Sequence, residues 1–325
     1  MRAVISRVVG GPETLTIEDI ADPVAGAGEV VVAMRACALN FFDTLITRDR
    51  YQFKPERPFS PGGEIAGIVE SLGDGVTGVA VGDRVIAYLK WGGAREKVVV
   101  PAGDLVAMPD GLDFVTAATL TVTYGTAIHG LADRGAVRPG ETVAVLGASG
   151  GAGQAAVEIA KLLGARVIAC ASGAEKLAFC RSVGADEVID YESEDLKVRL
   201  KLLTGGRGVD VVYDTVGDRF AEPAVRATAW RGRYLVVGFA AGEIPKIPLN
   251  LLLLKGCDLR GVFWGDHLVR EPAAFAEEMR RLMAWVVDGR LRPHVHGTWP
   301  LEETPAAIAE IAARRVRGKI VVVAG

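Results

Sequence analysis

The 325-residue sequence is poor in cysteine and histidine, with four of each, and neither forms a metal-binding pattern. The four cysteines are scattered and contain no C-x-x-C pair, so we expect reduced thiols and no disulfide framework. Only His294 and His296 are close together in the sequence. This H-x-H pair follows a proline in a turn that looks exposed, and we interpret it as solvated. We predict that the protein binds no metal.

Long apolar runs and an excess of one charge are also missing. Uncharged apolar runs, such as 249–254, are far too short to cross a bilayer. Near the start of the sequence, Gly10-Gly11-Pro12 interrupts the apolar pattern before it is long enough for the core of a signal peptide. Lysine and arginine number 37 against 40 aspartates and glutamates, which leaves no basic footprint for nucleic acid or an anionic membrane. We therefore expect a cytoplasmic protein without nucleic-acid or membrane partners.

Glycine is abundant, and one glycine-rich stretch organises the chain: TVAVLGASGGAG at 142–153. Five β-prone residues lead into the turn, and a helical pattern follows over 154–163. A strand, a tight turn and a helix in this order form a pyrophosphate-binding unit, because the unpaired N–H groups at the helix start face the anion. The alternative is a structural turn without a ligand. We predict that the dinucleotide contacts Gly150, Gly151, Ala152 and Gly153.

The pattern of short segments divides the chain. Residues 1–122 contain short strand-like runs separated by Gly, Pro and Asp turns, with one short helix over 40–48, which is typical of a compact β domain. From about residue 125, strands and helices alternate, as in a doubly wound parallel sheet. The end of the chain returns to a β pattern at 319–323. We predict an α/β fold in which a dinucleotide-binding domain (123–266) is inserted in a mostly β domain (1–122 and 267–325).

Five collinear motifs span nearly the whole chain: ALNFFDTLITRDRY (38–51), PGGEIAGIVESLG (61–73), GDRV (82–85), LGASGGAGQAAVEIAKLLGA (146–165) and GADEVIDY (184–191). Through them the sequence resembles the medium-chain dehydrogenase/reductase superfamily, most closely its zinc-free quinone oxidoreductase (zeta-crystallin-like) branch. The resemblance implies a GroES-like catalytic domain, a Rossmann domain and an active site in the cleft between them. It also implies a homodimer formed through the edge of the Rossmann sheet.

The resemblance also bears on metal use. Zinc-dependent relatives have a cysteine ligand where this chain has Asn40, and a histidine ligand where it has Gly63. A catalytic zinc needs three Cys, His or carboxylate ligands, and Glu64 alone cannot replace them. The four-cysteine lobe that holds a structural zinc in some relatives is absent as well. Both observations favour a zinc-independent enzyme.

The end of the second Rossmann strand indicates which nucleotide is bound. NAD-binding folds carry Asp or Glu about 20 residues past the glycines, and this chain has Cys-Ala-Ser there, ending at Ser172. Without that carboxylate, nothing repels a 2′-phosphate, and Ser172 and Lys176 offer a hydroxyl and a cation. The resemblance implies that Lys176 and Tyr191 contact the phosphate end of the adenosine. Glu175 remains a rival ligand for the ribose, and Lys176 has the alternative of an ordinary solvated charge. The pattern favours NADPH over NADH.

Four further cofactor contacts are implied by the resemblance. The backbone at Gly238 approaches the dinucleotide, and Thr126 and Phe263 lie near the nicotinamide. Arg314 matches a tail arginine that reaches the phosphate, and two neighbouring arginines in RRVRGK are its rivals. For each of these residues, packing or surface charge is the alternative interpretation.

Without a Lewis acid, the acceptor must itself be electrophilic, such as a quinone or an α,β-unsaturated carbonyl. Our hypothesis is direct hydride transfer from NADPH to such an acceptor. Asn40 would hydrogen-bond the carbonyl or the nicotinamide ribose, and Tyr51 would donate to the developing enolate or quinol oxygen. Tyr51 has the alternative of simple packing, and Leu45 replaces a second tyrosine of bacterial quinone reductases. An enoyl-thioester (enoyl-CoA) reductase and a non-catalytic NADPH-binding protein are the competing functions.

Overall fold

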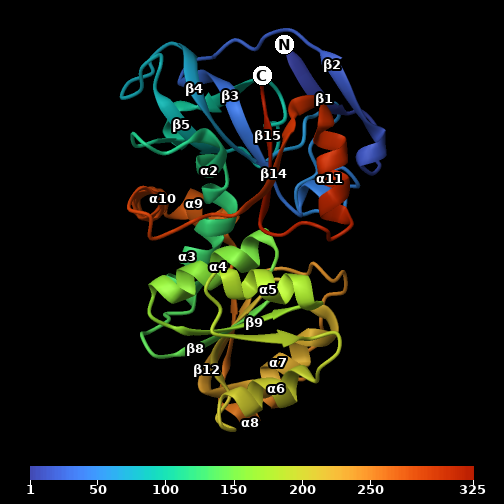
Figure 1. Ribbon diagram of the computed structural model, residues 1–325. Helices are drawn as coiled ribbons and strands as arrows, with labels where there is room; N and C mark the ends of the chain where they lie inside the picture. Colours follow the sequence, from blue (N-terminus) through green and yellow to red (C-terminus); the bar gives the residue numbers. More distant parts are fainter. The chain divides into compact units, whose positions relative to one another are not determined.

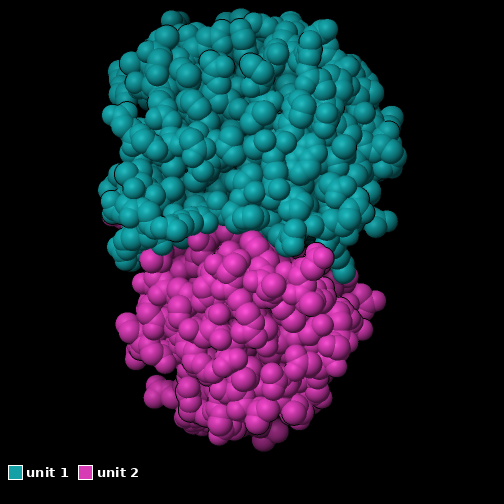
Figure 2. Space-filling model, in the orientation of Figure 1, with its two compact units in different colours: residues 1–122, 279–325 teal, residues 123–278 magenta.

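The computed structural model describes all residues 1–325, and the chain divides into two compact units. Unit 1 comprises 1–122 and 279–325, and unit 2 comprises 123–278 (Figure 2). Each unit has an apolar core of its own. Segment 267–278, which the sequence analysis placed with the β domain, lies in unit 2, where the ring of His267 stacks on that of His129.

Unit 1 is built on a seven-stranded sheet in the order β14-β15-β3-β4-β5-β7, with β6 also paired to β3. All neighbouring pairs are antiparallel except β14 and β15. Because β15 lies against β3, the last strand of the chain joins the sheet formed by strands β3 to β7 (Figure 1). The strands are β3 (Glu29–Leu39), β4 (Glu64–Leu72), β5 (Arg84–Tyr88), β6 (Lys97–Pro101), β7 (Leu105–Ala107), β14 (Val295–Pro300) and β15 (Lys319–Val323).

Short elements complete unit 1. The strands β1 (Arg2–Ser6) and β2 (Leu15–Asp19) form an antiparallel pair. Its helices are α1 (Asp43–Ile46), α2 (Phe114–Ala118) and α11 (Thr304–Ala312), and α10 (Pro272–Val287) runs from unit 2 into unit 1 along the chain. The helix expected over 40–48 is thus confirmed in place but shorter, because the carboxylate of Asp43 accepts the backbone N–H of Asn40 before α1 begins.

Unit 2 contains a six-stranded sheet in the order β10-β9-β8-β11-β12-β13, with every pair parallel. Numbered within the unit, this order is 3-2-1-4-5-6, the arrangement of a dinucleotide-binding Rossmann fold. The predicted α/β class and doubly wound sheet are therefore confirmed. The strands are β8 (Thr142–Leu146), β9 (Arg166–Ala171), β10 (Glu187–Asp190), β11 (Val209–Asp214), β12 (Thr228–Val236) and β13 (Asp258–Gly261).

Five helices connect consecutive strands of unit 2: α4 (Gly151–Leu162), α5 (Ala174–Ser182), α6 (Leu196–Leu203), α7 (Ala221–Ala227) and α8 (Asn250–Lys255). The helix α3 (Gly125–Ile128) precedes β8, and α9 (Trp264–Arg270) follows β13. Side chains of α6, α7 and α8 form one core cluster with β8, β9 and β11. Burial of the inner strands on both faces explains their continuous apolar sequence. No helix in either unit is both long and apolar enough to cross a membrane.

The outer strand β13 leaves one edge of the unit 2 sheet unpaired. Large apolar side chains are exposed on and around α8, among them Leu249, Leu253, Leu254 and Trp230. The homodimer expected from the family resemblance stays a prediction.

Candidate active site

The glycine-rich turn lies where the chain leaves β8 and enters α4. Gly147 adopts φ +73°, a conformation that only glycine takes up easily, and Gly150 is the N-cap of α4 without a side-chain cap. A Cβ at Gly153 would lie 2.1 Å from the carbonyl oxygen of Gly147, so the helix packs directly on the turn. At Gly150 the nearest atom to an added Cβ is 3.6 Å away, so no neighbouring atom packs tightly against the backbone there. The uncapped start of a 12-residue helix is therefore available to an anion.

The turn lies at the topological switch point of the sheet, because β9 lies on one side of β8 and β11 on the other. In open α/β sheets, ligands bind at this point, outside the carboxyl ends of the strands. Gly238 adjoins the same edge, where its N–H and that of Val237 donate to the carbonyl of Asp214, the last residue of β11. The sequence-predicted Gly238 thus lies with the glycine turn at the carboxyl edge.

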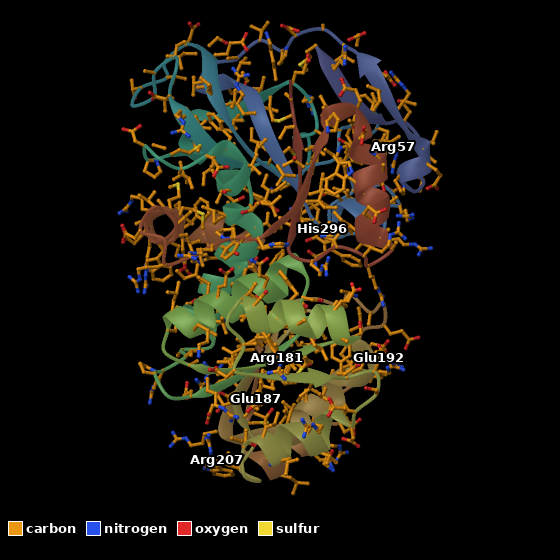
Figure 3. All side chains as sticks on the ribbon, in the orientation of Figure 1. Arg57, Arg181, Glu187, Glu192, Arg207 and His296 are labelled. Carbon is orange, nitrogen blue, oxygen red and sulfur yellow. The ribbon has the colours of Figure 1, made fainter.

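The residues expected at the adenosine end follow β9 and β10 at that edge. Tyr191 donates its backbone N–H to the carbonyl of Ala171 at 3.2 Å, which brings it beside Ser172. Its ring contacts that of Phe220, with centroids 4.4 Å apart. Glu192, the next residue, pairs with Arg219 (Figure 3). No carboxylate ends β9, which closes with Ala171.

Lys176 and Glu175 differ in exposure on the first turn of α5. Lys176 is half-buried, whereas Glu175 is exposed. The backbone N–H of Gly173 donates to the carboxylate of Asp190 at 3.3 Å, so the segment between β9 and α5 is tied to the end of β10. Ser172 directly follows β9, and Lys176 lies on the first turn of α5.

The two residues expected at the nicotinamide belong to segments that touch. A Cβ at Gly125 would lie 2.7 Å from the indole nitrogen of Trp264, so α3 packs closely on the start of α9. Thr126 follows Gly125, and Phe263 precedes Trp264 with half of its side chain exposed. Arg314 lies in unit 1 with φ +58°, beside Arg315, whose guanidinium is paired with Glu310.

In unit 1, Asn40 belongs to a buried polar network that also contains Glu64 and Lys319. Strand pairing creates it: β4 aligns Glu64 with Ala38, and β15 aligns Ile320 with Leu39. The ammonium of Lys319 donates to the Asn40 Oδ1 at 2.6 Å, the Glu64 Oε1 at 2.8 Å and the Leu39 carbonyl at 2.9 Å. All three protons of the ammonium are therefore used.

Glu64 is satisfied in the same way. Its Oε1 also accepts from the Asn40 Nδ2 at 2.9 Å, and its Oε2 accepts from the hydroxyl of Thr121 and the N–H of Val122. A buried ion pair persists only when its remaining hydrogen-bonding capacity is filled, as it is here. Asn40 is consequently held with its oxygen toward the ammonium and its nitrogen toward the carboxylate.

A second buried carboxylate supports the loop before α1. Asp43 is wholly buried and accepts the backbone N–H groups of Asn40 at 2.7 Å and of Gly62 at 2.8 Å. Burial raises the pKa of the Asp43 carboxyl to about 6, against the two hydrogen bonds, which lower it. Asp43 thus fixes the backbone on both sides of the network.

The donor set at these positions does not fit a catalytic zinc. Asn40 and Gly63 stand where zinc-dependent relatives have ligands, and glycine has no donor atom. The Asn40 Oδ1 and the Glu64 Oε1 both already accept hydrogen bonds from the Lys319 ammonium. A metal ion there would have one carboxylate ligand, and it would have to displace a cation of the protein itself.

Tyr51 lies in a row of aromatic side chains in unit 1. Its ring stacks on Phe42, with centroids 5.4 Å apart, and meets Phe53 edge-on at 5.6 Å. The ring centroids of Phe53 and Trp91 lie 6.4 Å apart, and the ammonium of Lys90 lies 5.4 Å from the centroid of the Phe53 ring. All five side chains are half-buried. Burial and the nearby Asp43 raise the pKa of the Tyr51 hydroxyl, which keeps it protonated as a donor.

Comparison with known proteins agrees with this geometry. The family model "Alcohol dehydrogenase GroES-like domain" matches residues 26–110, and "Zinc-binding dehydrogenase" matches 151–286. The chain is 38% identical to the "Quinone oxidoreductase-like protein 2 homolog" of Nematostella vectensis over 99% of this chain and 88% of that protein. The chain belongs to the quinone oxidoreductase-like family of medium-chain dehydrogenases/reductases. It is an oxidoreductase with a GroES-like domain and a Rossmann fold.

Two further relatives of this oxidoreductase extend the comparison. The quinone oxidoreductase of Pseudomonas aeruginosa is 35% identical and covers 96% of each chain. The crystal structure of Escherichia coli quinone oxidoreductase complexed with NADPH matches with a TM-score of 0.93 and 27% identity, over 99% of this chain and all of that one. The family resemblance inferred from the sequence motifs is thus confirmed.

Sequence reasoning missed several polar residues of this oxidoreductase. Lys319 counted only as the start of a strand, although a lysine heading the apolar run KIVVV signals a buried cation that needs a partner. Nothing in the sequence around Thr121 or Asp43 indicated that these side chains would hydrogen-bond near the candidate site. Their roles depend on which strands and loops become neighbours.

Proposed function

We propose that this oxidoreductase uses NADPH to reduce a quinone or an α,β-unsaturated carbonyl, without a catalytic metal. The carrying observation is the saturated hydrogen-bond network of Lys319, Asn40 and Glu64, in which Asn40 stands where the family resemblance places a zinc ligand. Without a Lewis acid in that place, an unactivated alcohol or carbonyl is a poor partner, and an acceptor that is already electrophilic is needed. When bound, NADPH supplies a hydride to the electrophilic carbon of the acceptor.

The cofactor assignment is supported by unit 2. The uncapped N–H groups at Gly151, Ala152 and Gly153 suit the pyrophosphate, and Gly150 leaves space for its approach. We propose that Ser172, Lys176 and Tyr191 hold the 2′-phosphate end, and that Gly238, Thr126, Phe263 and Arg314 make the remaining contacts. The relative in Escherichia coli was crystallised with NADPH, which agrees with the missing carboxylate at the end of β9.

The hydrogen bonds of Asn40 distinguish its two expected roles. Its Nδ2 already donates to Glu64, and the carbonyl of Ala38 lies within reach at 3.4 Å, so no N–H remains for a substrate carbonyl. Its Oδ1 accepts one proton from Lys319 and keeps a second lone pair. We therefore propose that the Asn40 Oδ1 accepts a hydrogen bond from a hydroxyl of the nicotinamide ribose.

Tyr51 is then the residue that we propose for the acceptor oxygen. A protonated hydroxyl in a half-buried aromatic row can donate to the enolate or quinol oxygen as negative charge develops there. The neighbouring rings of Phe42, Phe53 and Trp91 offer apolar faces for a flat quinone.

The test is turnover of a substrate panel. Oxidation of NADPH, with NADH in parallel, is measured against an ortho-quinone, a para-quinone, a short alkenal and an enoyl-CoA. We expect quinone or alkenal to be reduced with a clear preference for NADPH. Preference for the thioester would replace the proposed acceptor class. Tight NADPH binding without any turnover would contradict the proposal and favour a binding protein.

A further inference from the structure

Two histidines that lie far apart in the sequence meet inside unit 2. His129 begins a π-helical segment (129–134), and His267 lies in α9. Their rings stack with centroids 4.0 Å apart and planes 15° from parallel, and each residue is only 6% exposed. π-Helical turns are rare and frequently mark functional positions. The pair therefore requires a physical explanation.

A carboxylate joins the two rings. The Oε2 of Glu278, in α10, lies 3.2 Å from the Nε2 of His267, and one ligand atom of each of the three residues lies within 4.8 Å of the others. Zinc bonds of about 2.0–2.2 Å place neighbouring ligand atoms of a tetrahedral site about 3.3 Å apart. His267 and Glu278 already have this spacing. A shift of at most about 1.5 Å brings His129 to it.

The carboxylates around the two rings also suit histidine ligands of a metal ion. The Nδ1 atoms of His129 and His267 are buried and have no hydrogen bond. Each nevertheless lies near a carboxylate four residues on, at 3.2 Å from Asp133 and 3.5 Å from Glu271. A carboxylate beside one ring nitrogen, with the other nitrogen toward a metal, is the usual outer shell of a histidine ligand. Three carboxylates around two imidazoles also suit a divalent cation.

We propose that His129, His267 and Glu278 form a binding site for a divalent transition-metal ion, with zinc as the first candidate. Two imidazoles and one carboxylate favour zinc and its neighbours over magnesium, which prefers oxygen ligands. The site lies in unit 2, whereas the zinc positions of the family's metal-dependent members correspond to residues of unit 1. Bound there, the ion ties the segment after α3 to α9 and α10. Its role is structural, and it is independent of the proposed hydride transfer.

The test uses the full-length protein produced without a histidine tag and stripped with a chelator. Zinc chloride is titrated by calorimetry, thermal unfolding is followed with and without zinc, and cobalt(II) is added as a spectroscopic probe. We expect one zinc per chain, a higher Tm with zinc, and visible cobalt bands of a tetrahedral nitrogen–oxygen site. His267→Gln, His129→Gln and Glu278→Gln are each expected to weaken zinc binding at least about tenfold.

The matched control is the double variant His294→Gln, His296→Gln, which removes the other two histidines and leaves the cluster intact. His296 lies on β14 of unit 1 (Figure 3). Its zinc affinity and its Tm shift should equal those of the wild type. If a histidine variant fails to fold, Glu278→Gln decides, because its side chain is partly exposed and the change is isosteric. Wild-type binding weaker than about 1 mM, or unchanged binding in Glu278→Gln, would overturn the proposal.

Discussion

The ammonium of Lys319 and the carboxylate of Glu64 lie 2.8 Å apart, in side chains that are 3% and 0% exposed. These residues come from β15 and β4, two strands that are not neighbours but both flank β3. The pair holds the amide of Asn40 in one orientation, since Asn40 bonds to both of its members. Stability and the geometry of the candidate site therefore depend on the same contact.

Lys319→Met should destabilise the protein strongly. Removing the ammonium leaves Glu64 buried and unpaired, and loss of one partner from a buried ion pair costs about 3–5 kcal/mol. Urea unfolding measures the loss. Lys97→Met is the control, because Lys97 pairs with Asp22 and Glu70 at the surface, where ion pairs contribute little, and we expect a much smaller loss. Equal losses in the two variants would contradict the role of the network.

Substitutions in the glycine turn should separate packing from cofactor binding. In Gly153→Ala, the new methyl group would meet the Gly147 carbonyl, so both Tm and NADPH affinity should fall. In Gly150→Ala the methyl group has room, so Tm should stay near the wild-type value while the Kd for NADPH rises about tenfold. Fluorescence titration and thermal melts give both quantities. Unchanged NADPH affinity in Gly150→Ala would exclude the turn as the phosphate site.

Lys176→Ala should reduce the preference for NADPH over NADH. The loss of one cation from a half-buried position near the 2′-phosphate is expected to lower the ratio of kcat/KM values about tenfold. Glu175→Ala is the matched control on the same turn of α5, and it should leave the ratio within about twofold. If Glu175→Ala changes the ratio and Lys176→Ala does not, the register proposed for the nucleotide is wrong.

Tyr51→Phe should lower kcat/KM for the acceptor about tenfold to a hundredfold while the KM for NADPH stays unchanged, because the phenyl ring keeps the stacking on Phe42. The raised pKa of the Tyr51 hydroxyl gives a second expectation. In the wild type, deprotonation of Tyr51 should therefore not lower kcat/KM at any pH below about 10. Wild-type turnover by Tyr51→Phe would show that the residue only packs.

The sequence predicts those parts of the fold that are coded locally. The glycine spacing and the apolar strand before it identify β8 and α4, because turn, strand and helix are consecutive. Irregular pairing is not coded in this way: β12 begins at Thr228, and its pairing with β11 shifts register between Val209 and Val211.

Long-range contacts could not be predicted from the local sequence pattern. Pairing of β15 with β3 brings Lys319 to Asn40, which is 279 residues away in the sequence, and no local pattern indicates such a contact. The stacking of His129 on His267 likewise depends on how α9 packs against the segment after α3. The roles of the candidate residues named from the sequence stay predictions, while the side chains that orient Asn40 became visible only in the fold.

The most direct test of metal-independent hydride transfer is quinone reduction by the chelator-stripped enzyme. NADPH oxidation is followed with a para-quinone before stripping, after stripping and after zinc is restored, at a temperature well below the Tm of the stripped protein. We predict the same kcat/KM for the quinone in all three states, because Asn40 and Glu64 are already bonded to Lys319 and leave no ligand set for a catalytic zinc. Activity that is lost on stripping and restored by zinc would contradict the account.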